Sequence, residues 1–326
     1  MEYKKLGETD LDISRIGFGC WAIGGHGYGK VDDDESINAV QRALELGINF
    51  FDTADVYGFG HSEEILSKGL GTERNKVIIA TKFGVNWDQQ GKTYRDCSPK
   101  RIVAALEGSL FRLRVDCISL YQIHWYDGIT PISEAMETLR KCQEEGKIRH
   151  IGCSNFSMEL ILEASKTHRL ESNQLLYNLA HRNSEKEISR CAEELEMGIL
   201  AYGALARGLF SGRYRLGASF GDNDTRGRDE EFRGETFRKN LHWVDRLKEI
   251  GLAYGKSPSQ VAIRWVLENE NVTCAIVGAK NGMQIEENIG ALGWRLAKGN
   301  VHFFTRETGT VEEKGSDCFK GHGKLL

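Results

Sequence analysis

The alternation of short apolar runs with amphipathic segments is the feature that most constrains the fold of this chain. Runs that suit buried strands recur at residues 16–19, 48–51, 77–80, 117–123, 148–153, 172–176, 198–201 and 273–277. The segments between them carry apolar residues at helical spacing, as Ile37, Val40 and Leu44 do. This alternation is typical of a parallel sheet covered by helices.

Local signals predict where several helices begin and end. The three prolines each follow a hydroxyl residue, in Ser98-Pro99, Thr130-Pro131 and Ser257-Pro258. A hydroxyl N-cap accepts an unpaired helical N–H, and a proline at the first helical position has no N–H to leave unpaired, so each pair predicts a helix start. Gly47, after Leu44-Glu45-Leu46, predicts a helix end.

Eight strands that alternate with about eight helices predict a (β/α)₈ TIM barrel, for which the 326 residues are sufficient. An open, doubly wound sheet is the alternative. Residues 3–6 and 11–13 flank the polar segment 7–10 and predict a short N-terminal β-hairpin, which would plug the bottom of the barrel. We expect one barrel domain over residues 1–294.

Two regions depart from the alternation. Residues 211–235 are rich in Gly, Asp and Arg and have no apolar period, which predicts a long mobile loop before a helix that begins near Thr236. Residues 295–326 show no capped, periodic helix, and we expect this tail to be disordered or loosely draped.

Composition excludes several classes of partner. The chain is 40% apolar, and its formal charge of −4 arises from mixed acids and bases, without a basic patch for nucleic acid or a polybasic arm for membranes. No apolar stretch approaches the ~18 residues of a membrane span. The eight cysteines never form Cys-x-x-Cys, which favours free thiols in a reducing compartment. We expect a cytoplasmic protein; its oligomeric state stays open.

Ionisable side chains close three of the early strands. Asp52, Lys82 and His124 follow the second, third and fourth apolar runs, and Tyr57 lies five residues beyond Asp52. In a barrel these positions meet on the C-terminal rim, where active sites form. Each residue alone also suits ordinary packing or solvation, but their coincidence on one rim favours catalysis.

These four residue types suit the reduction of a carbonyl group. A phenol has a pKa of about 10, and a neighbouring ammonium such as that of Lys82 would lower it. Asp52 would hold Lys82, and His124 would orient the substrate oxygen. Metal-ligand and Gly-x-Ser-x-Gly motifs are absent, so we expect no metal. The segment after Gly17-Phe18-Gly19 reads as a loop, which argues against a Rossmann phosphate loop.

Six motifs occur in an order that identifies a resemblance. From Tyr3 to about Trp294 the chain contains FDTADVYGFGHSEE, IIATKFG, YQIHW, IGCSNF, YGALARGLFSG and IVGAKNGMQIEEN. In these it resembles the aldo-keto reductases, and among them the bacterial branch similar to general stress reductases. The resemblance implies that Asp52, Tyr57, Lys82 and His124 are catalytic. A nicotinamide hydride would attack the carbonyl carbon while Tyr57 protonates the oxygen.

The same resemblance implies the contacts of the cofactor. Ser154, Asn155 and Gln174 would hold the carboxamide, and Tyr202 would stack beneath the nicotinamide. The remaining implied contacts are Gly203, Leu205, Arg207 and Leu209 at the pyrophosphate, Gly278, Lys280, Gln284, Glu287 and Asn288 at the adenosine end, and Gly19, Cys20, Trp21 and Asp52 elsewhere. Lys280 would meet a 2′-phosphate, so we expect NADPH in preference to NADH. The 211–235 segment matches the family loosely, and the tail after Trp294 does not resemble its closing helix.

Three functions are compatible with these residues. The first is an NADPH-dependent reductase of small aldehydes and ketones, in which Trp21, Trp87 and Trp125, with Tyr57 and His124, line the substrate pocket; rim packing explains the tryptophans equally well. The second is a nucleotide-sensing or partner-binding barrel with slow turnover. The third is a barrel isomerase or lyase on phosphorylated substrates, because one fold hosts many chemistries.

Overall fold

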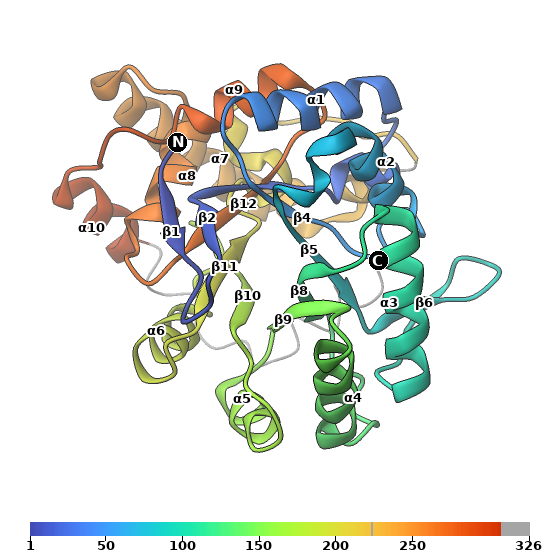
Figure 1. The fold of residues 1–326 in the computed structure, drawn as a ribbon. Helices are drawn as coiled ribbons and strands as arrows, with labels where there is room; N and C mark the ends of the chain where they lie inside the picture. The colour runs from blue at the N-terminus through green and yellow to red at the C-terminus, as the bar shows by residue number, and fades with distance from the viewer. Residues whose placement is uncertain (223, 308–326) are drawn as a thin grey trace.

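The computed structural model describes residues 1–222 and 224–307 and forms a closed barrel of eight parallel strands (Figure 1). Around the barrel the order is β10-β11-β12-β3-β4-β5-β8-β9. The strands are β3 (Ile16–Gly19), β4 (Phe50–Asp52), β5 (Ile78–Phe83), β8 (Ile118–Ile123), β9 (Ile148–Ser154), β10 (Ser172–Leu176), β11 (Gly198–Tyr202) and β12 (Cys274–Gly278). The barrel prediction is therefore confirmed, and the doubly wound alternative is wrong.

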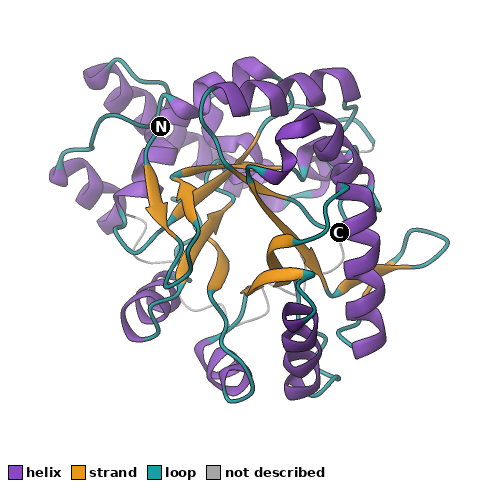
Figure 2. Cartoon of the chain, in the orientation of Figure 1, coloured by secondary structure: helices purple, strands orange, loops and turns teal. Residues whose placement is uncertain are grey.

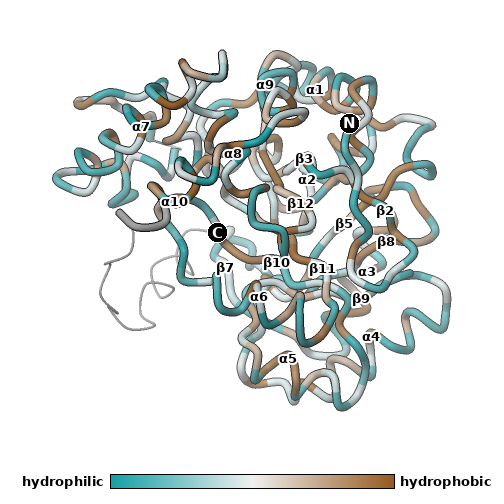
Figure 3. The backbone as a smooth tube through the Cα atoms, turned by 90° about the vertical axis from the view of Figure 1, so that its left-hand side faces the viewer, coloured by the Kyte–Doolittle hydropathy of each residue, from teal (hydrophilic) through white to brown (hydrophobic). Residues whose placement is uncertain are grey.

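Helices surround the barrel, with the strands in the centre (Figure 2). They are α1 (Asp33–Glu45), α2 (His61–Leu70), α3 (Pro99–Leu113), α4 (Ile132–Glu144), α5 (Met158–Ser165), α6 (Glu185–Glu194), α7 (Gly234–Tyr254), α8 (Pro258–Glu268), α9 (Gly282–Ile289) and α10 (Lys298–Glu307). Short 3₁₀ turns are η1 (Ala22–Gly24), η2 (Gly71–Asn75), η3 (Ala206–Ser211), η4 (Thr225–Arg228) and η5 (Glu230–Phe232). The peripheral helices carry hydrophobic and hydrophilic residues along their length, as amphipathic helices do (Figure 3).

The N-terminal hairpin fills the bottom of the barrel. Strands β1 (Tyr3–Lys5) and β2 (Asp12–Ser14) pair antiparallel, as predicted. Leu6 and Leu11 are buried in one cluster with the inward-facing strand residues Phe50, Leu120 and Leu200. The barrel therefore has a packed interior whose lower end is covered by the hairpin, and its upper end is left for function.

Most of the predicted helix boundaries hold. Ser98 caps α3 and Ser257 caps α8, each with its hydroxyl accepting a backbone N–H and with proline in the first turn. Gly47 has a φ of 84°, which suits the residue after a helix end. The boundary at Thr130 is wrong. Helix α4 begins at Ile132 with Pro131 as its N-cap, because the Thr130 hydroxyl donates instead to Asp127 at 2.7 Å.

A second hairpin, which the sequence patterns did not predict, follows β5. It consists of β6 (Val85–Trp87) and β7 (Thr93–Arg95) and projects away from the barrel in Figure 1. Its strands have three residues each, too few to show a period. The hairpin brings Trp87 beside Phe59, with their ring centroids 5.4 Å apart.

The described part of the segment 211–235, which leaves out residue 223, is folded, although it contains little regular structure. It holds η4 and η5, and α7 begins at Gly234, close to the predicted start. Tyr214, Phe220 and Phe232 form a mutual aromatic cluster with centroid distances of 5.2 to 5.5 Å. The expected loop is present, and aromatic packing rather than periodicity shapes it; its mobility stays a prediction.

The expectation of a tail without helix is wrong for Lys298–Glu307, which form α10. Phe304 is fully buried, and its ring centroid lies 6.1 Å from that of Trp243 on α7. This tertiary contact stabilises a helix whose sequence carries no predicted capping residue and no strong apolar period. The rest of the predicted tail, residues 308–326, lies outside the described residues.

Two further properties concern the whole described chain. All seven cysteines in the described residues are free thiols, as expected, and Cys318 lies outside them. Within residues 1–222 and 224–307, every helix is too short or too polar to cross a membrane.

Candidate active site

The register of the barrel strands brings the predicted site residues together. Gly19 lies opposite Asp52, Lys82 opposite Gln122, and Ser154 opposite Gln174. All lie at or near the C-terminal ends of parallel strands, so they share one end of the barrel. A cavity of about 450 Å³ opens there.

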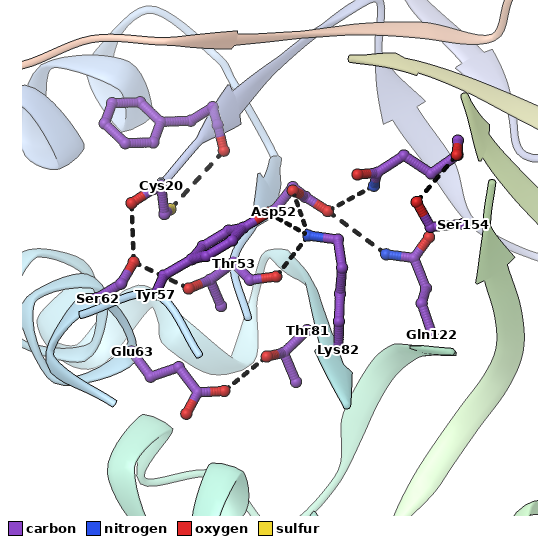
Figure 4. A network of polar contacts seen from close by, with 12 residues as sticks. Cys20, Asp52, Thr53, Tyr57, Ser62, Glu63, Thr81, Lys82, Gln122 and Ser154 are labelled. Atoms are coloured by element: carbon purple, nitrogen blue, oxygen red, sulfur yellow. Dashed lines mark hydrogen bonds and ion pairs between the residues drawn. The ribbon is translucent and has the colours of Figure 1, made fainter. Parts of the chain in front are cut away.

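Lys82 is the centre of a buried polar network (Figure 4). Its ammonium donates to Asp52 Oδ2 at 2.7 Å and to the carbonyl oxygen of Thr53 at 2.7 Å. A longer contact of 3.4 Å reaches the Tyr57 hydroxyl. Lys82 is fully buried, so its charge is compensated by these oxygens rather than by water.

Asp52 is held on both of its oxygens. Oδ2 binds Lys82, and Oδ1 accepts from Gln174 Nε2 at 2.8 Å and from Gln122 Nε2 at 3.4 Å. Three strands other than its own therefore contribute to its position. A carboxylate bound by this many donors is held in one orientation and fixes the Lys82 side chain in turn.

Tyr57 lies in the loop between β4 and α2, whose backbone is crowded against η1. The backbone N–H of Tyr57 donates to the Ala54 carbonyl at 3.2 Å. The next residue, Gly58, has a φ of +59°, and a Cβ there would lie only 1.9 Å from the carbonyl oxygen of Gly24. Glycine is required at this position, because any side chain would push the Tyr57 loop off η1.

Aromatic neighbours enclose the Tyr57 ring. Trp21 stacks on it with centroids 6.0 Å apart, and His124 meets it edge to face at 5.6 Å. The Lys82 ammonium lies 5.0 Å from the ring centroid. The phenol is thus held between an indole, an imidazole and a cation.

The structure corrects the expectation that Lys82 lowers the pKa of Tyr57. Burial raises this pKa well above its ordinary value, and the negative charge of Asp52 adds to the rise. Asp52 partly cancels the field of the Lys82 ammonium at the phenol. The Tyr57 phenol is therefore protonated at neutral pH.

His124 is neutral in this environment. Burial lowers its pKa well below the usual value, and the cations Lys82 and Arg95 lower it further. Its Nδ1 is buried without a hydrogen-bond partner among the described residues. The ring lines the cavity beside Tyr57, where a neutral imidazole can donate one hydrogen bond.

A second polar group lines the cavity at β9, β10 and β11. The Ser154 hydroxyl donates to the Gln174 carbonyl at 3.0 Å, and the Asn155 amide donates to Ser154 Oγ at 3.0 Å. Tyr202 donates from its hydroxyl to Asn155 Oδ1 at 3.0 Å. Asn155 has a φ of 60°, a conformation that asparagine tolerates better than most residues.

Cationic side chains line the same cavity. Arg207 lies 5.4 Å from the Trp21 ring and is ion-paired with Asp229 at 2.8 Å. Its backbone is left-handed, with a φ of 55°. Lys280 donates to the Tyr28 carbonyl at 2.5 Å, and its backbone N–H is bound by Gln284. Arg213 and Arg226 are further cations in the lining.

Residues 224–231 cross this end of the barrel, and we call them the strap. At one end, Thr225 donates from its hydroxyl to the Gly27 carbonyl at 2.8 Å. In the middle, Asp229 holds Arg207. At the other end, Glu231 pairs with His181, which follows β10. The strap thus joins loops from distant parts of the barrel.

Sequence reasoning missed the cavity residues outside the family motifs. Tyr28, His181, Arg226, Asp229 and Glu231 all line the cavity. They lie in loops and short 3₁₀ turns without an apolar period, so only the folded path of the chain brings them together. The signal available was the density of Arg and Asp in the 211–235 segment.

Most of the predicted contacts do line the cavity, with four exceptions. The predicted residues in the lining are Gly19, Trp21, Asp52, Tyr57, His124, Trp125, Ser154, Asn155, Gln174, Tyr202, Gly203, Leu205, Arg207, Gly278, Lys280, Gln284, Glu287 and Asn288. Lys82 lies directly beneath, fully buried. Cys20 and Leu209 are fully buried in the core. Trp87 packs instead against Phe59 and Arg101.

Comparison with known proteins places this geometry in a family. The model of the aldo/keto reductase family matches residues 15–302. The chain belongs to the aldo/keto reductase family. Aldo-keto reductase YhdN of Bacillus subtilis is 38% identical over 299 residues, which cover 91% of this chain and 90% of that protein. Aldo-keto reductase yakc [NADP(+)] of Schizosaccharomyces pombe is 33% identical, covering 99% of this chain and 96% of that protein.

Solved aldo/keto reductase structures share the barrel. The glycerol dehydrogenase AKR11B4 of Gluconobacter oxydans superposes with a TM-score of 0.86 at 39% identity, covering 94% of this chain and 95% of that one. Aldo-keto reductase AKR11C1 of Bacillus halodurans gives 0.78 at 28% identity, covering 96% and 99%. The Bacillus and Gluconobacter relatives support the bacterial branch that the motifs resemble, and the family supports an oxidoreductase that uses a nicotinamide cofactor.

Proposed function

We propose that this aldo/keto reductase is an NADPH-dependent reductase of small aldehydes and ketones, in which Tyr57 donates the proton. The observation that carries the proposal is the Asp52–Lys82–Tyr57 chain, with distances of 2.7 and 3.4 Å, beneath a cavity that His124 also lines. A proton donor and a neutral hydrogen-bond donor thus converge on one point. This arrangement suits a carbonyl oxygen that gains a proton as its carbon is reduced.

The residues of the cavity fit a nicotinamide dinucleotide. Ser154, Asn155 and Gln174 offer amide and hydroxyl groups that match a carboxamide, and Tyr202 offers an aromatic face. Arg207, Arg213, Arg226 and Lys280 suit the phosphates of such a ligand. Bound here, the nicotinamide would supply the hydride.

Cations near Lys280 favour NADPH over NADH. Burial lowers the pKa of Lys280, and the positive charge of Arg226 lowers it further. Asp224 opposes this effect and also pairs with Arg226 at 2.5 Å. An additional phosphate would relieve the repulsion between the two cations. The Schizosaccharomyces relative carries NADP(+) in its name, in agreement with this preference.

Three side chains of the protein would take part in the proton transfer. His124, neutral because of its burial, donates a hydrogen bond from Nε2 to the carbonyl oxygen and orients it. Tyr57 keeps its proton until the oxygen gains negative charge and then transfers it. Lys82, held by Asp52, donates to the phenolate oxygen that results. The products would be the oxidised cofactor, which has given up a hydride, and the alcohol, which has gained that hydride on carbon and the Tyr57 proton on oxygen.

The decisive experiment measures NADPH oxidation at 340 nm with a panel of aldehydes, for the wild type and for Tyr57→Phe. We expect turnover by the wild type, and in Tyr57→Phe a fall in kcat of about 10²–10⁴-fold, the usual contribution of a general acid. The dissociation constant of NADPH should stay within about twofold. Tight NADPH binding without turnover of any carbonyl would instead favour the nucleotide-sensing role.

A further inference from the structure

Two buried carboxylates flank Tyr57 in the sequence. Asp55 precedes it by two residues and Glu63 follows it by six, and both are fully buried. Asp55 binds the Arg101 guanidinium at 2.5 Å, and Glu63 binds the Arg112 guanidinium at 2.7 Å. The segment that carries the phenol is therefore tied down by an ion pair on each side.

Both arginines belong to one face of α3. Arg101 and Arg112 are eleven residues apart, which is close to three helical turns, so their side chains leave the helix in the same direction. Glu63 is fixed from a second side by Thr81 of β5, whose hydroxyl donates to it at 2.6 Å, as Figure 4 shows. The backbone N–H of Asp55 donates to the Lys82 carbonyl at 3.4 Å. Both anchors thus connect α3 to the strand that supplies Lys82.

The Asp55–Arg101 pair is poorly satisfied for a purely stabilising contact. Asp55 Oδ1 and Arg101 Nε are both buried without a hydrogen-bond partner among the described residues. Burial raises the pKa of Asp55, although the charges of Arg101 and Arg112 oppose the rise. Replacing such a pair by apolar residues is often neutral or stabilising, so stability alone does not account for it.

Arg101 also contacts the aromatic residues beside the site. Its guanidinium lies 5.5 Å from the Trp87 ring centroid, and Trp87 packs on Phe59, two residues after Tyr57. Arg101 therefore meets the Tyr57 loop at two points, through Asp55 and through the Trp87–Phe59 pair. A shift of the Arg101 guanidinium would therefore displace the loop both before Tyr57, at Asp55, and after it, at Phe59.

We propose that Arg101 is a positioning residue, which through Asp55 holds the Tyr57 loop at the distance from Lys82 that proton transfer requires, while Arg112–Glu63 anchors the far end of the loop. The inference rests on the proposed role of Tyr57. A misplacement of about 1 Å in such a group can lower the rate by about 10²-fold without any loss of binding.

The test compares the wild type with Arg101→Gln, Arg101→Lys and the control Arg140→Gln. Among residues 1–222 and 224–307, Arg140 of α4 forms ion pairs with Glu137 and Glu144 of its own helix. Turnover is measured with NADPH that carries hydrogen or deuterium at the transferred position. We expect kcat of Arg101→Gln to fall at least about tenfold with a larger isotope effect, because chemistry becomes more rate-limiting. Arg101→Lys should recover part of the loss, and Arg140→Gln should match the wild type.

The isotope effect separates positioning from folding. A substitution that only lowers the fraction of folded protein reduces the apparent kcat but leaves the isotope effect unchanged, because the folded molecules still react as the wild type does. Hydrogen exchange of peptides covering residues 53–60 gives a second readout that needs no turnover, and we expect faster exchange in Arg101→Gln than in Arg140→Gln. If the wild type shows no turnover, the proposed function fails, and faster exchange in Arg101→Gln would then show only that Arg101 holds the Tyr57 loop in place.

Unchanged exchange together with an unchanged isotope effect in folded Arg101→Gln would overturn the inference. Should Arg101→Gln not fold, the double variant Asp55→Asn/Arg101→Gln replaces it, because it leaves neither charge buried alone. The double variant is expected to show the same larger isotope effect and the same faster exchange. Wild-type values for both would reject the positioning role.

Discussion

At the scale of single residues, the buried polar residues of the proposed active site were predictable and the loop residues were not. Asp52, Lys82 and His124 could be named because each follows an apolar run, and parallel strands of a barrel finish at one rim. His181 and Glu231 could not, because no period links positions that are fifty residues apart in irregular segments. Predicting the direction of the Tyr57 pKa required knowing how deeply the phenol is buried.

If Lys280 binds the 2′-phosphate, its removal should weaken the binding of NADPH more than that of NADH. Lys280→Met removes the cation proposed to meet the 2′-phosphate, so we expect NADPH affinity to fall by about ten- to a hundredfold, the value of a charge-assisted hydrogen bond. NADH affinity should change by less than about twofold. Fluorescence titration with both nucleotides measures this, with the exposed Lys30→Met as the control. An unchanged NADPH affinity would rule out the role of Lys280.

The neutral state of His124 predicts how stability depends on pH. Its folded pKa lies well below 6.5, so in the acid range the unfolded chain binds a proton that the folded chain does not. The free energy of unfolding should therefore fall by ~1.4 kcal/mol for each pH unit below about 6.5, until the folded pKa is reached. His124→Asn should lack this contribution. Urea unfolding at pH 7.5 and 5.5 measures the difference, and exposed His242→Asn should keep the wild-type slope.

At the scale of elements, the sequence periodicity predicted the barrel, whereas the elements outside it depend on tertiary contacts that the sequence does not reveal. The eight barrel strands and the N-terminal hairpin were readable from period and turn residues. Helix α10 and the β6–β7 hairpin were not, because α10 depends on burial of Phe304 and the hairpin strands are only three residues long. The strap likewise owes its path to side chains from other loops.

The position of the strap predicts that bound NADPH protects it from proteolysis. Its contacts with Gly27, Arg207 and His181 carry it across the proposed phosphate site. NADPH should therefore slow tryptic cleavage after Arg226 and Arg228, by about tenfold at saturation, because opening the strap would also cost the phosphate contacts. Mass spectrometry of limited digests follows these cuts. Cleavage at the same rate with and without NADPH would show that the strap is not a lid.

At the scale of the whole molecule, the lower end of the barrel contributes to stability, and the opposite end holds the cavity. The hairpin closes the lower end through Leu6, which is fully buried against Gly198. Leu6→Ala should lower the free energy of unfolding by about 2–5 kcal/mol, as for other buried leucines. Because the cavity lies at the opposite end, kcat per folded molecule should stay within about twofold. Denaturant unfolding and activity measure the two effects, with Lys5→Ala as the control; a large fall in kcat would contradict this separation.

The contact between Gly58 and the Gly24 carbonyl limits how the enzyme can be diversified. A Cβ at position 58 would lie 1.9 Å from that oxygen, so every other amino acid displaces the loop that carries Tyr57. Trp21 and Trp125, by contrast, contribute side chains to the cavity lining, where a change of side-chain size would alter the space in the cavity. A directed-evolution library for new substrates should therefore vary the tryptophans and keep codon 58 fixed, since clones altered there would be lost before any change of specificity was seen.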